Sequence, residues 1–482
     1  MKNNESLNLT VQIKANLQSD LSHAFESYLP VDLIEDTARS VMDKSRERIF
    51  TPVNTTLTML LSAIQEDKSH QRAVNIFKER FERRCKEARD AEAAELETEK
   101  LKANQGEKKR GRPRQYQSRL PKSYQQSISN STAAYTTARK NLDQSVIEAV
   151  YAYSTDFGDL EKESWYGMRT YISDGTYLQL QDTEDIRSQY PVKAKEAKEG
   201  KEKIQEEVQE ESSYPQALLQ VMIRQGTGQI SQLAIASRQE SELYLILPMI
   251  KKMEKNSLLL ADDLYNTYYH FCLILSKQCH TIVPGKRTRN YKVIREINAN
   301  DQLVEIAKTT RPNYVSKEEW KNLPSTILLR RITYTYPTKN GLKTAVLYTT
   351  ILDEHIKSAD IVAKYTMRWD IEITIREVKT LMDINVLRSK SKNMLIKELY
   401  VSLTAYNLVR KIITQSADKV GFSPQEDIFH KCASFGRTVL LDKKGRVFFK
   451  WSPGRYGYAN VTNQQTPDPR QKRETTSLSK KN

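Results

Sequence analysis

The sequence contains few of the residues that cross-link small proteins or bind structural metals. Its 482 residues include four cysteines and six histidines, and these do not fall at the short spacings of zinc ligands. A disulfide framework or a zinc site is therefore not expected. Reduced thiols of this kind are typical of a cytosolic protein.

Long apolar runs are absent as well. The longest ones, such as LTMLLSAI at 57–64, are far shorter than the roughly 20 apolar residues of a membrane helix, and the first residues are polar, unlike a signal peptide. We therefore expect no membrane partner and a cytoplasmic location.

Acidic residues are outnumbered by basic ones. Asp and Glu number 60 against 76 Lys and Arg, which gives a formal net charge of +16. This excess favours a polyanionic partner, and nucleic acid is the first candidate because no basic amphipathic membrane anchor stands out. A basic protein with no such partner is the alternative.

The N-terminal part of the chain has helical periodicity. Residues 1–100 carry apolar residues at helical spacing and then a highly charged run from Ser69. We predict a helical N-terminal DNA-binding domain here. A solvated surface helix is the plainer explanation of the charged run.

Residues 101–160 are predicted to form a basic linker. Within it Arg110, Arg112 and Arg114 alternate with Gly111 and Pro113, which resembles the core of an AT-hook. In that motif extended arginines lie in narrow A·T minor grooves, where the negative potential is deepest. A plain basic tether fits the same residues.

From residue 161 the pattern changes to strands. Residues 161–280 are predicted as the first part of an α/β domain, in which Asp174-Gly175-Thr176 separates two strand-like runs as a turn. Gly226-Thr227-Gly228 is predicted as a hairpin turn. A helix at 240–250 then precedes a short apolar strand that ends on Asp262-Asp263. Carboxylates just beyond such a strand are typical of the ligand-binding edge of an α/β sheet.

The remaining sequence divides into three segments. Residues 281–357 carry strong hairpin signals and are predicted as a β-rich insertion subdomain. Residues 358–416 are expected to form the second part of the α/β domain. Residues 417–482 are predicted as a C-terminal region with a basic, disordered tail.

The segment from Ser358 to Ile384 carries the strongest functional pattern, and we predict a helix there. Tyr365, Arg368, Glu372 and Lys379 fall within a sector roughly 60° wide on one face of an α-helix. A second, apolar stripe should face a core, and it consists of Met367, Ile371, Ile375, Val378 and Met382. A surface ion pair explains many such helices. The adjacent apolar stripe and the basic chain favour a site for a metal ion and a phosphate.

These motifs together resemble the DDE transposases of bacterial insertion sequences, in particular the insertion-sequence-four family. That family carries a Tyr-x2-Arg-x3-Glu-x6-Lys signature, which residues 365–379 match without a gap. Its first catalytic Asp lies in a DGT motif, found here at 174–176, and its second opens an Asp-x-x-Tyr motif, found here at 262–265. The motifs LRSKS (387–391) and AYNLVR (405–410) also match, and the resemblance covers residues 165–415.

The resemblance implies an α/β fold, with an RNase H-like catalytic domain interrupted by the β-rich insertion and preceded by the helical N-terminal domain. It implies that Asp174, Asp262 and Glu372 are the catalytic residues and hold two Mg²⁺ or Mn²⁺ ions, hard cations that prefer oxygen ligands. Asp263 is the alternative to Asp262 as a metal ligand. It stands where the family commonly has Arg.

The same resemblance implies DNA contacts around the carboxylates. Tyr365, Arg368 and Lys379 are expected to hold the phosphate beside the cut. A base extruded at the DNA end would stack on an aromatic ring, for which Trp320 is the candidate; a core or surface role for Trp320 is as plausible.

The implied activity is cut-and-paste transposition by metal-dependent cleavage at the element ends and strand transfer, through a hairpin intermediate. The implied partners are double-stranded DNA, namely the terminal inverted repeats and the target, with a homodimer on two ends, in the bacterial cytoplasm at the nucleoid. Two alternatives remain open. One is a decayed or regulatory copy that binds ends without cutting, and the other is a general acid/base hydrolase.

Overall fold

The computed structural model describes residues 28, 31–42, 49–65, 68–104, 120–121, 124, 128–129, 131–158, 164–192, 214–285, 289–338, 341–380 and 382–420, and three short strands, β10 (Val439–Leu441), β11 (Val447–Trp451) and β12 (Arg455–Tyr458). The AT-hook-like arginines 110, 112 and 114, the charged stretch 193–213 and the C-terminal tail after 458 lie outside these residues. Among the described residues, no helix is long and apolar enough to cross a bilayer.

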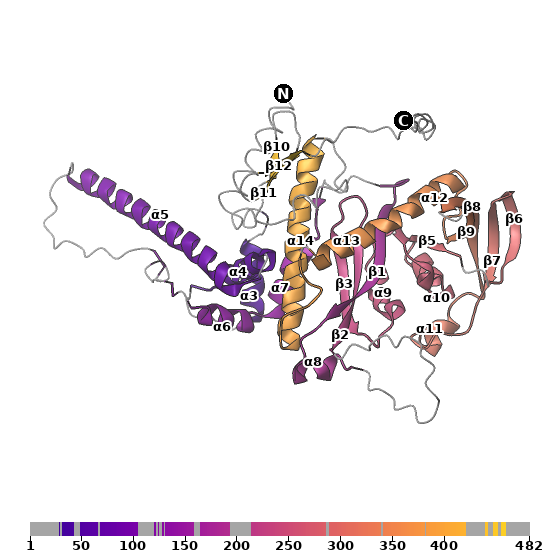
Figure 1. Ribbon diagram of the computed structural model, residues 1–482, viewed down its shortest axis with the longest axis horizontal. Coiled ribbons are helices and arrows are strands. Elements are labelled where there is room, and N and C mark those ends of the chain that lie inside the picture. Colours follow the sequence, from indigo (N-terminus) through magenta and orange to yellow (C-terminus); the bar gives the residue numbers. More distant parts are fainter. Residues whose placement is uncertain are drawn as a thin grey trace, which may run out of the picture.

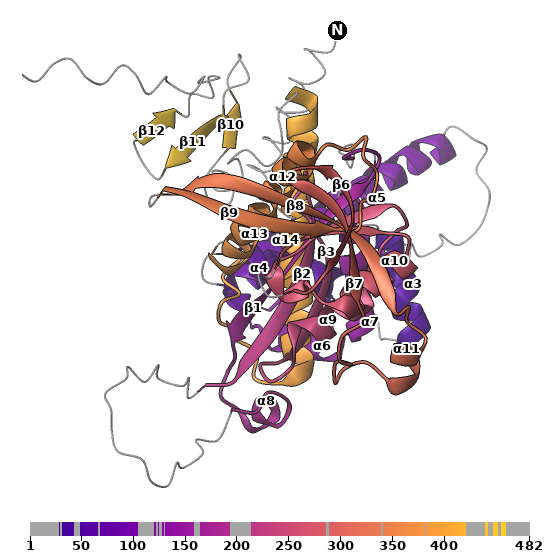
Figure 2. The same ribbon diagram turned by 90° about the vertical axis from the view of Figure 1, so that its right-hand side faces the viewer.

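A nine-stranded mixed sheet with the order β3-β2-β1-β4-β5-β9-β8-β7-β6 is the centre of the fold (Figures 1 and 2). Strands β1, β4 and β5 run parallel, whereas β1, β2 and β3 form an antiparallel meander. The predicted hairpin turn joins β2 to β3, with Gly226 and Gly228 at φ of 98° and 72°. The bounds of these strands are β1 Arg169–Gln179, β2 Gln216–Arg224, β3 Ile230–Ser237, β4 Ser257–Leu260 and β5 His280–Pro284.

Strand β1 corrects one prediction. Asp174-Gly175-Thr176 is not a turn but the middle of a continuous strand, because each of its residues pairs with β2, opposite Val221, Gln220 and Leu219. Long-range pairing has outweighed the local turn preference of Asp-Gly. Asp174 is therefore held on a rigid strand.

The β-rich segment 281–357 does not form a sheet of its own. Strand β9 pairs with β5, so β6 to β9 extend the same nine-stranded sheet. Their bounds are β6 Lys292–Asn298, β7 Asp301–Ala307, β8 Thr326–Thr338 and β9 Gly341–Thr349, with the short helix α11 (Lys317–Lys321) between β7 and β8.

Each face of the sheet is covered by helices, and side-chain alternation along the strands separates the two cores. Leu259 belongs to a core formed with α9 (Glu242–Lys251) and α10 (Tyr268–Ser276). Leu258 and Leu260 belong to the opposite core, shared with α14 (Lys392–Val420). The carboxyl ends of the parallel strands thus lie between two packed layers.

The N-terminal helices belong to the same core as α14, which lies between them and the sheet (Figure 1). Helices α4 and α7 pack against α14, and α5 projects away from the body of the molecule (Figure 1). Thr51 caps α4 by accepting a hydrogen bond from the backbone N–H of Asn54 (3.2 Å), and Pro52 occupies its first turn. The bounds are α3 Val31–Val41, α4 Pro52–Ile64, α5 His70–Asn104, α6 Ala133–Asn141, α7 Gln144–Ser154 and α8 Glu184–Gln189.

The predicted single helix at 358–384 is interrupted. It consists of α12 (Ser358–Thr366), a 3₁₀ turn η4 (Met367–Trp369) and α13 (Asp370–Thr380). A 3₁₀ turn rotates each residue further than an α-helix does, so the expected apolar stripe breaks at this point. Met367 is consequently 44 % exposed, whereas Ile371 and Val378 are buried as predicted.

Candidate active site

Two predicted carboxylates lie at neighbouring strands, Asp174 within β1 and Asp262 two residues beyond the end of β4. In the parallel pair of β1 and β4, Ile172 aligns with Leu260, and Asp174 and Asp262 each follow two residues later. Strand pairing thus brings together two residues that are far apart in the sequence, at the same level of the sheet.

Asp174 is partly buried among charged groups. Its Oδ1 accepts a hydrogen bond from the backbone N–H of Gly175 (2.9 Å). Burial raises the pKa of its carboxyl, the charges of Asp262 and Glu372 raise it further, and Arg368 lowers it. Asp262, Glu372 and Arg368 are therefore all close enough to Asp174 for their charges to act on its carboxyl.

Asp262 is held at the start of the 3₁₀ turn η3 (Asp263–Tyr265) by accepting a hydrogen bond from the backbone N–H of Leu264 (2.9 Å). Burial raises the pKa of Asp262, the neighbouring charge of Asp263 adds to this, and Arg368 opposes it. Asp263 itself is exposed to solvent. Of the two adjacent aspartates, Asp262 is therefore the one that faces the site.

Glu372 comes from α13, which packs against β1. The segment after α13 returns to the end of β1, where Gln179 donates its backbone N–H to the carbonyl of Asn385 and accepts one from Leu387 (2.9 and 3.0 Å). Glu372 lies 3.6 Å from the guanidinium of Arg368. These contacts fix the helix beside the strand that carries Asp174.

The other residues of the Tyr-Arg-Glu-Lys signature lie at different distances from the carboxylates. Tyr365 is half-buried and hydrogen-bonded to Arg368; burial raises the pKa of its phenol and Arg368 lowers it. Lys379 lies about two helical turns beyond Glu372, and burial lowers the pKa of its amine. Tyr365 and Arg368 therefore belong to the carboxylate site, and Lys379 lies further along the same helix.

Trp320, the aromatic residue predicted to stack a base, lies on α11. Trp320 is partly buried and packs against the core that contains α10, edge-on to Tyr268, with the amine of Lys308 5.3 Å from the centre of its ring. The exposed aromatic beside the carboxylates is Trp369, which is 58 % exposed and 4.9 Å from the guanidinium of Arg368. Its position directly after the signature arginine was the signal available in the sequence.

A fourth carboxylate, Glu242, was not predicted. It opens α9, and burial raises its pKa, with a further rise from the charge of Asp174. The phenol of Tyr265 donates a hydrogen bond to Glu242 Oε2 (3.3 Å). No motif marks this residue, since one acidic residue in the first turn of a helix is common.

The donor chemistry of the site suits a hard cation. Asp174, Asp262 and Glu372 offer only oxygen atoms, the preferred ligands of Mg²⁺ and Mn²⁺. Within the part of the chain that the structure describes, however, no three His, Cys, Asp or Glu side chains are close enough to hold one metal ion.

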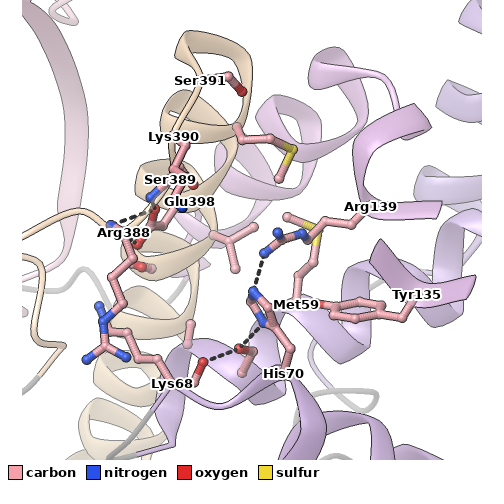
Figure 3. Close-up of a pocket in the computed structure, with 15 residues that line it drawn as sticks. Met59, Lys68, His70, Tyr135, Arg139, Arg388, Ser389, Lys390, Ser391 and Glu398 are labelled. Carbon is pink, nitrogen blue, oxygen red and sulfur yellow. Dashed lines mark hydrogen bonds between the residues drawn. The ribbon is translucent and has the colours of Figure 1, made fainter. Parts of the chain in front are cut away.

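A separate hollow of about 400 Å³ lies between α4, α6 and the start of α14 (Figure 3). Arg139 Nη1 lies 2.6 Å from His70 Nε2, and His70 Nδ1 lies 3.1 Å from Ser62 Oγ. Its lining also includes Lys68, Arg388, Ser389, Lys390, Ser391 and Glu398. The LRSKS motif thus borders the junction with the N-terminal helices rather than the carboxylates.

Comparison with known proteins identifies the family. The family model for the transposase DDE domain matches residues 165–408. The chain is 24 % identical over 334 residues to transposase InsG for insertion sequence element IS4 of Escherichia coli strain K12, covering 67 % of this chain and 69 % of InsG.

A cryo-EM structure of the piggyBac transposase synaptic complex with hairpin DNA covers 85 % of this chain and 77 % of that chain at 10 % identity, with a TM-score of 0.34. That likeness is too low to support an inference about this chain. The matched DDE domain model spans half of the sequence and contains every carboxylate described above, and the protein therefore belongs to the DDE transposases of the insertion-sequence-four family.

Proposed function

We propose that this transposase moves its insertion sequence by a cut-and-paste route, cleaving DNA at the element ends with divalent metal ions and joining them to target DNA. The observation that carries the proposal is that the parallel pairing of β1 and β4 brings Asp174 and Asp262 to the same level of the sheet, with Glu372 of α13 near enough for its charge to act on Asp174. The order of strands β3 to β5 supports assigning this part of the sheet to the RNase H-like type.

In this proposal the three carboxylates hold a pair of Mg²⁺ or Mn²⁺ ions. Such ions, when bound, lower the pKa of a nucleophilic water and neutralise charge that develops on the phosphate. In the folded chain, burial and the charges of neighbouring carboxylates raise the pKa of Asp174 and Asp262. A cationic ligand would relieve that repulsion.

Arg368 and Tyr365 are proposed to hold the phosphate beside the cut. The guanidinium lies close enough to Asp174 and Asp262 to lower the pKa of both. Its planar fork can donate two hydrogen bonds to one phosphate, and the phenol of Tyr365 extends the same donor surface.

A hairpin intermediate would require a base to leave the DNA stack. Trp369 is better placed than Trp320 to receive that base, because its ring is exposed beside Arg368 whereas Trp320 is partly buried against a core. Stacking on an aromatic ring is tolerant of base identity, as an enzyme that opens duplex ends requires.

The test compares adjacent aspartates. Asp262→Asn should abolish Mg²⁺-dependent nicking of a duplex that carries the element ends, while Asp263→Asn should keep most of the activity, and both should bind the duplex like the wild type. Gel analysis of nicked and hairpin products measures the outcome. Wild-type binding without cleavage in Mg²⁺ would indicate a regulatory copy, and cleavage in the presence of chelator would indicate a metal-independent hydrolase.

A further inference from the structure

The carboxylate of Glu242 occupies the space of a missing side chain in β1. A Cβ atom built on Gly175 would lie 2.4 Å from Glu242 Cδ and 2.6 and 2.8 Å from its two oxygens. Gly175 is paired with Gln220 in the strand, so it is space rather than an unusual backbone conformation that requires glycine here. The glycine of the DGT motif thus admits the Glu242 carboxylate to the backbone beside Asp174.

A chain of hydrogen bonds holds this carboxylate. Gln220 Nε2 donates to Ser173 Oγ (2.9 Å) and to the phenolic oxygen of Tyr265 (2.8 Å), and Tyr265 donates its proton to Glu242 Oε2 (3.3 Å). An amide nitrogen can only donate, so the phenol must accept from Gln220 and its one proton is left for Glu242. Gln220 and Tyr265 are buried, at 0 % and 2 % exposure. The Tyr265 hydrogen bond favours the charged form of Glu242.

Glu242 reaches the catalytic aspartates from the other layer of the molecule. Helix α9 packs in the core that contains Leu259, opposite the core that contains Ile172 and α13. The charges of Asp174 and Asp262 nevertheless both act on Glu242. The charge of Glu242 therefore acts on the predicted metal ligands Asp174 and Asp262. Because residue 175 is a glycine, no side chain separates this carboxylate from the backbone of β1.

We propose that Glu242 is a positioning residue of the transposase metal site: seated in the space left by Gly175 and held by Tyr265, its negative charge strengthens the binding of divalent cations by Asp174 and Asp262. This inference rests on the proposed function. It also assigns roles to two motif residues, because the glycine of DGT admits the carboxylate and the tyrosine of Asp-x-x-Tyr anchors it.

The test is Mn²⁺ binding by the full-length, DNA-free protein, measured by isothermal titration calorimetry. Glu242→Gln should weaken binding about tenfold, the range for groups that support metal ligands from outside the first shell. Glu240→Gln, at an exposed glutamate two residues earlier, is the matched control and should bind like the wild type. In cleavage assays, the Mg²⁺ concentration for half-maximal rate should rise to a similar extent, with a smaller change at saturating Mg²⁺.

Gly175→Ala provides a second variant that leaves Glu242 in the sequence. The atoms a Cβ would meet are the end of a flexible side chain, so the glutamate can move aside and the fold survives. Displacing the carboxylate should weaken Mn²⁺ binding about as much as Glu242→Gln does. The double variant should be no weaker than either single variant, because both remove the same interaction.

Two failures are distinguishable. If the wild type binds no Mn²⁺, or Asp174→Asn leaves binding unchanged, the proposed metal site itself is wrong. If Asp174→Asn abolishes binding while Glu242→Gln and Gly175→Ala both bind like the wild type, only the role of Glu242 is overturned.

Discussion

Arg368 sets the balance of charge at the carboxylate site. It lies 3.6 Å from Glu372, lowers the pKa of Asp174 and Asp262, and contacts the ring of Trp369. One cation therefore acts on all three predicted catalytic groups. Its removal would leave their mutual repulsion without this compensation.

Two substitutions of Arg368 should distinguish the effect of its positive charge on the cleavage rate from the effect of its planar guanidinium. Arg368→Ala is expected to lower the single-turnover cleavage rate by about 10- to 100-fold, the range for losing a hydrogen bond to a charged group. Arg368→Lys should recover part of the rate, since it restores the charge but not the planar fork. Arg376→Ala, at an exposed arginine on the following helix α13, is the control. A full rate in Arg368→Ala would contradict a phosphate-binding role.

The two tryptophans should respond to substitution in opposite ways. Trp369→Ala is expected to reduce hairpin formation at DNA ends with little change in stability, because its ring is exposed. Trp320→Ala should destabilise the protein by about 2 kcal/mol, because its partly buried ring packs against a core. Denaturant unfolding and hairpin yield measure the two effects. Loss of hairpins in a folded Trp320→Ala protein would restore the original assignment.

At the scale of elements, a buried ion pair connects strands β7 and β8 to the segment just before α12. Arg330 on β8 donates to both carboxylate oxygens of Asp301 on β7, and each side chain is 1 % exposed. Arg330 also donates to the carbonyls of Asp353 and Ile356 (both 2.8 Å), just before α12. The β6 to β9 part of the sheet thereby fixes the point at which the signature helix begins.

Removing one member of this ion pair should lower the free energy of unfolding more than replacing both members by apolar residues. Arg330→Met leaves Asp301 buried without its partner, which is expected to reduce the free energy of unfolding by about 3–5 kcal/mol. Arg330→Met combined with Asp301→Leu should recover much of that loss, since no charge is then left buried. Chemical denaturation of both variants is the measurement. Equal losses in the two variants would show that the backbone contacts of Arg330 dominate.

Helix α10 predicts a pH effect on stability. His270 is 3 % exposed and burial lowers its pKa to about 3. The unfolded chain therefore binds a proton more readily than the folded one below the ordinary histidine pKa near 6.5, and stability falls as the pH drops. His270 should contribute about 2 kcal/mol to the loss between pH 7 and pH 5, and the loss should be smaller by about that amount in His270→Gln. Urea unfolding at the two pH values tests this; an unchanged pH dependence in the variant would refute it.

At the scale of the whole molecule, the N-terminal helices and the sheet share a core. Lys68 Nζ donates to the carbonyl of Asp383 (2.6 Å), and Lys397 Nζ donates to the carbonyls of Arg139 and Lys140 at the end of α6 (3.3 and 3.0 Å). These contacts cross the same junction as the basic hollow of Figure 3. DNA bound by the N-terminal helices would therefore be held at a defined position relative to the carboxylates.

The net charge of +16 predicts DNA binding that weakens steeply with salt. Replacing Arg110, Arg112 and Arg114 by alanine should lower affinity and reduce the slope of log K against log salt concentration by up to about 0.9 per lost phosphate contact. Changing the same residues to lysine discriminates between the two roles. A plain tether should bind as before, whereas an AT-hook should lose its preference for A·T-rich duplexes. Fluorescence anisotropy over a salt series measures both.

The sequence alone indicated the family and the residue types of the candidate site, because those signals are local. The Tyr-Arg-Glu-Lys spacing, the DGT and the Asp-x-x-Tyr are each read within a few residues, and the domain match confirms the family they indicated. Predictions from local sequence were wrong where strand pairing or a 3₁₀ turn decided the structure. Asp174 lies within a strand rather than a turn, and the signature helix is broken by η4.

Only the tertiary structure decided which distant residues meet. The parallel pairing of β1 and β4 aligns Asp174 with Asp262, and the packing of α9 brings Glu242 to Gly175. Glu242 has no motif, because its position depends on space left by a residue far away in the chain. Periodicity reports which face of an element is apolar, but the contacts between elements depend on how their side chains fill one shared volume.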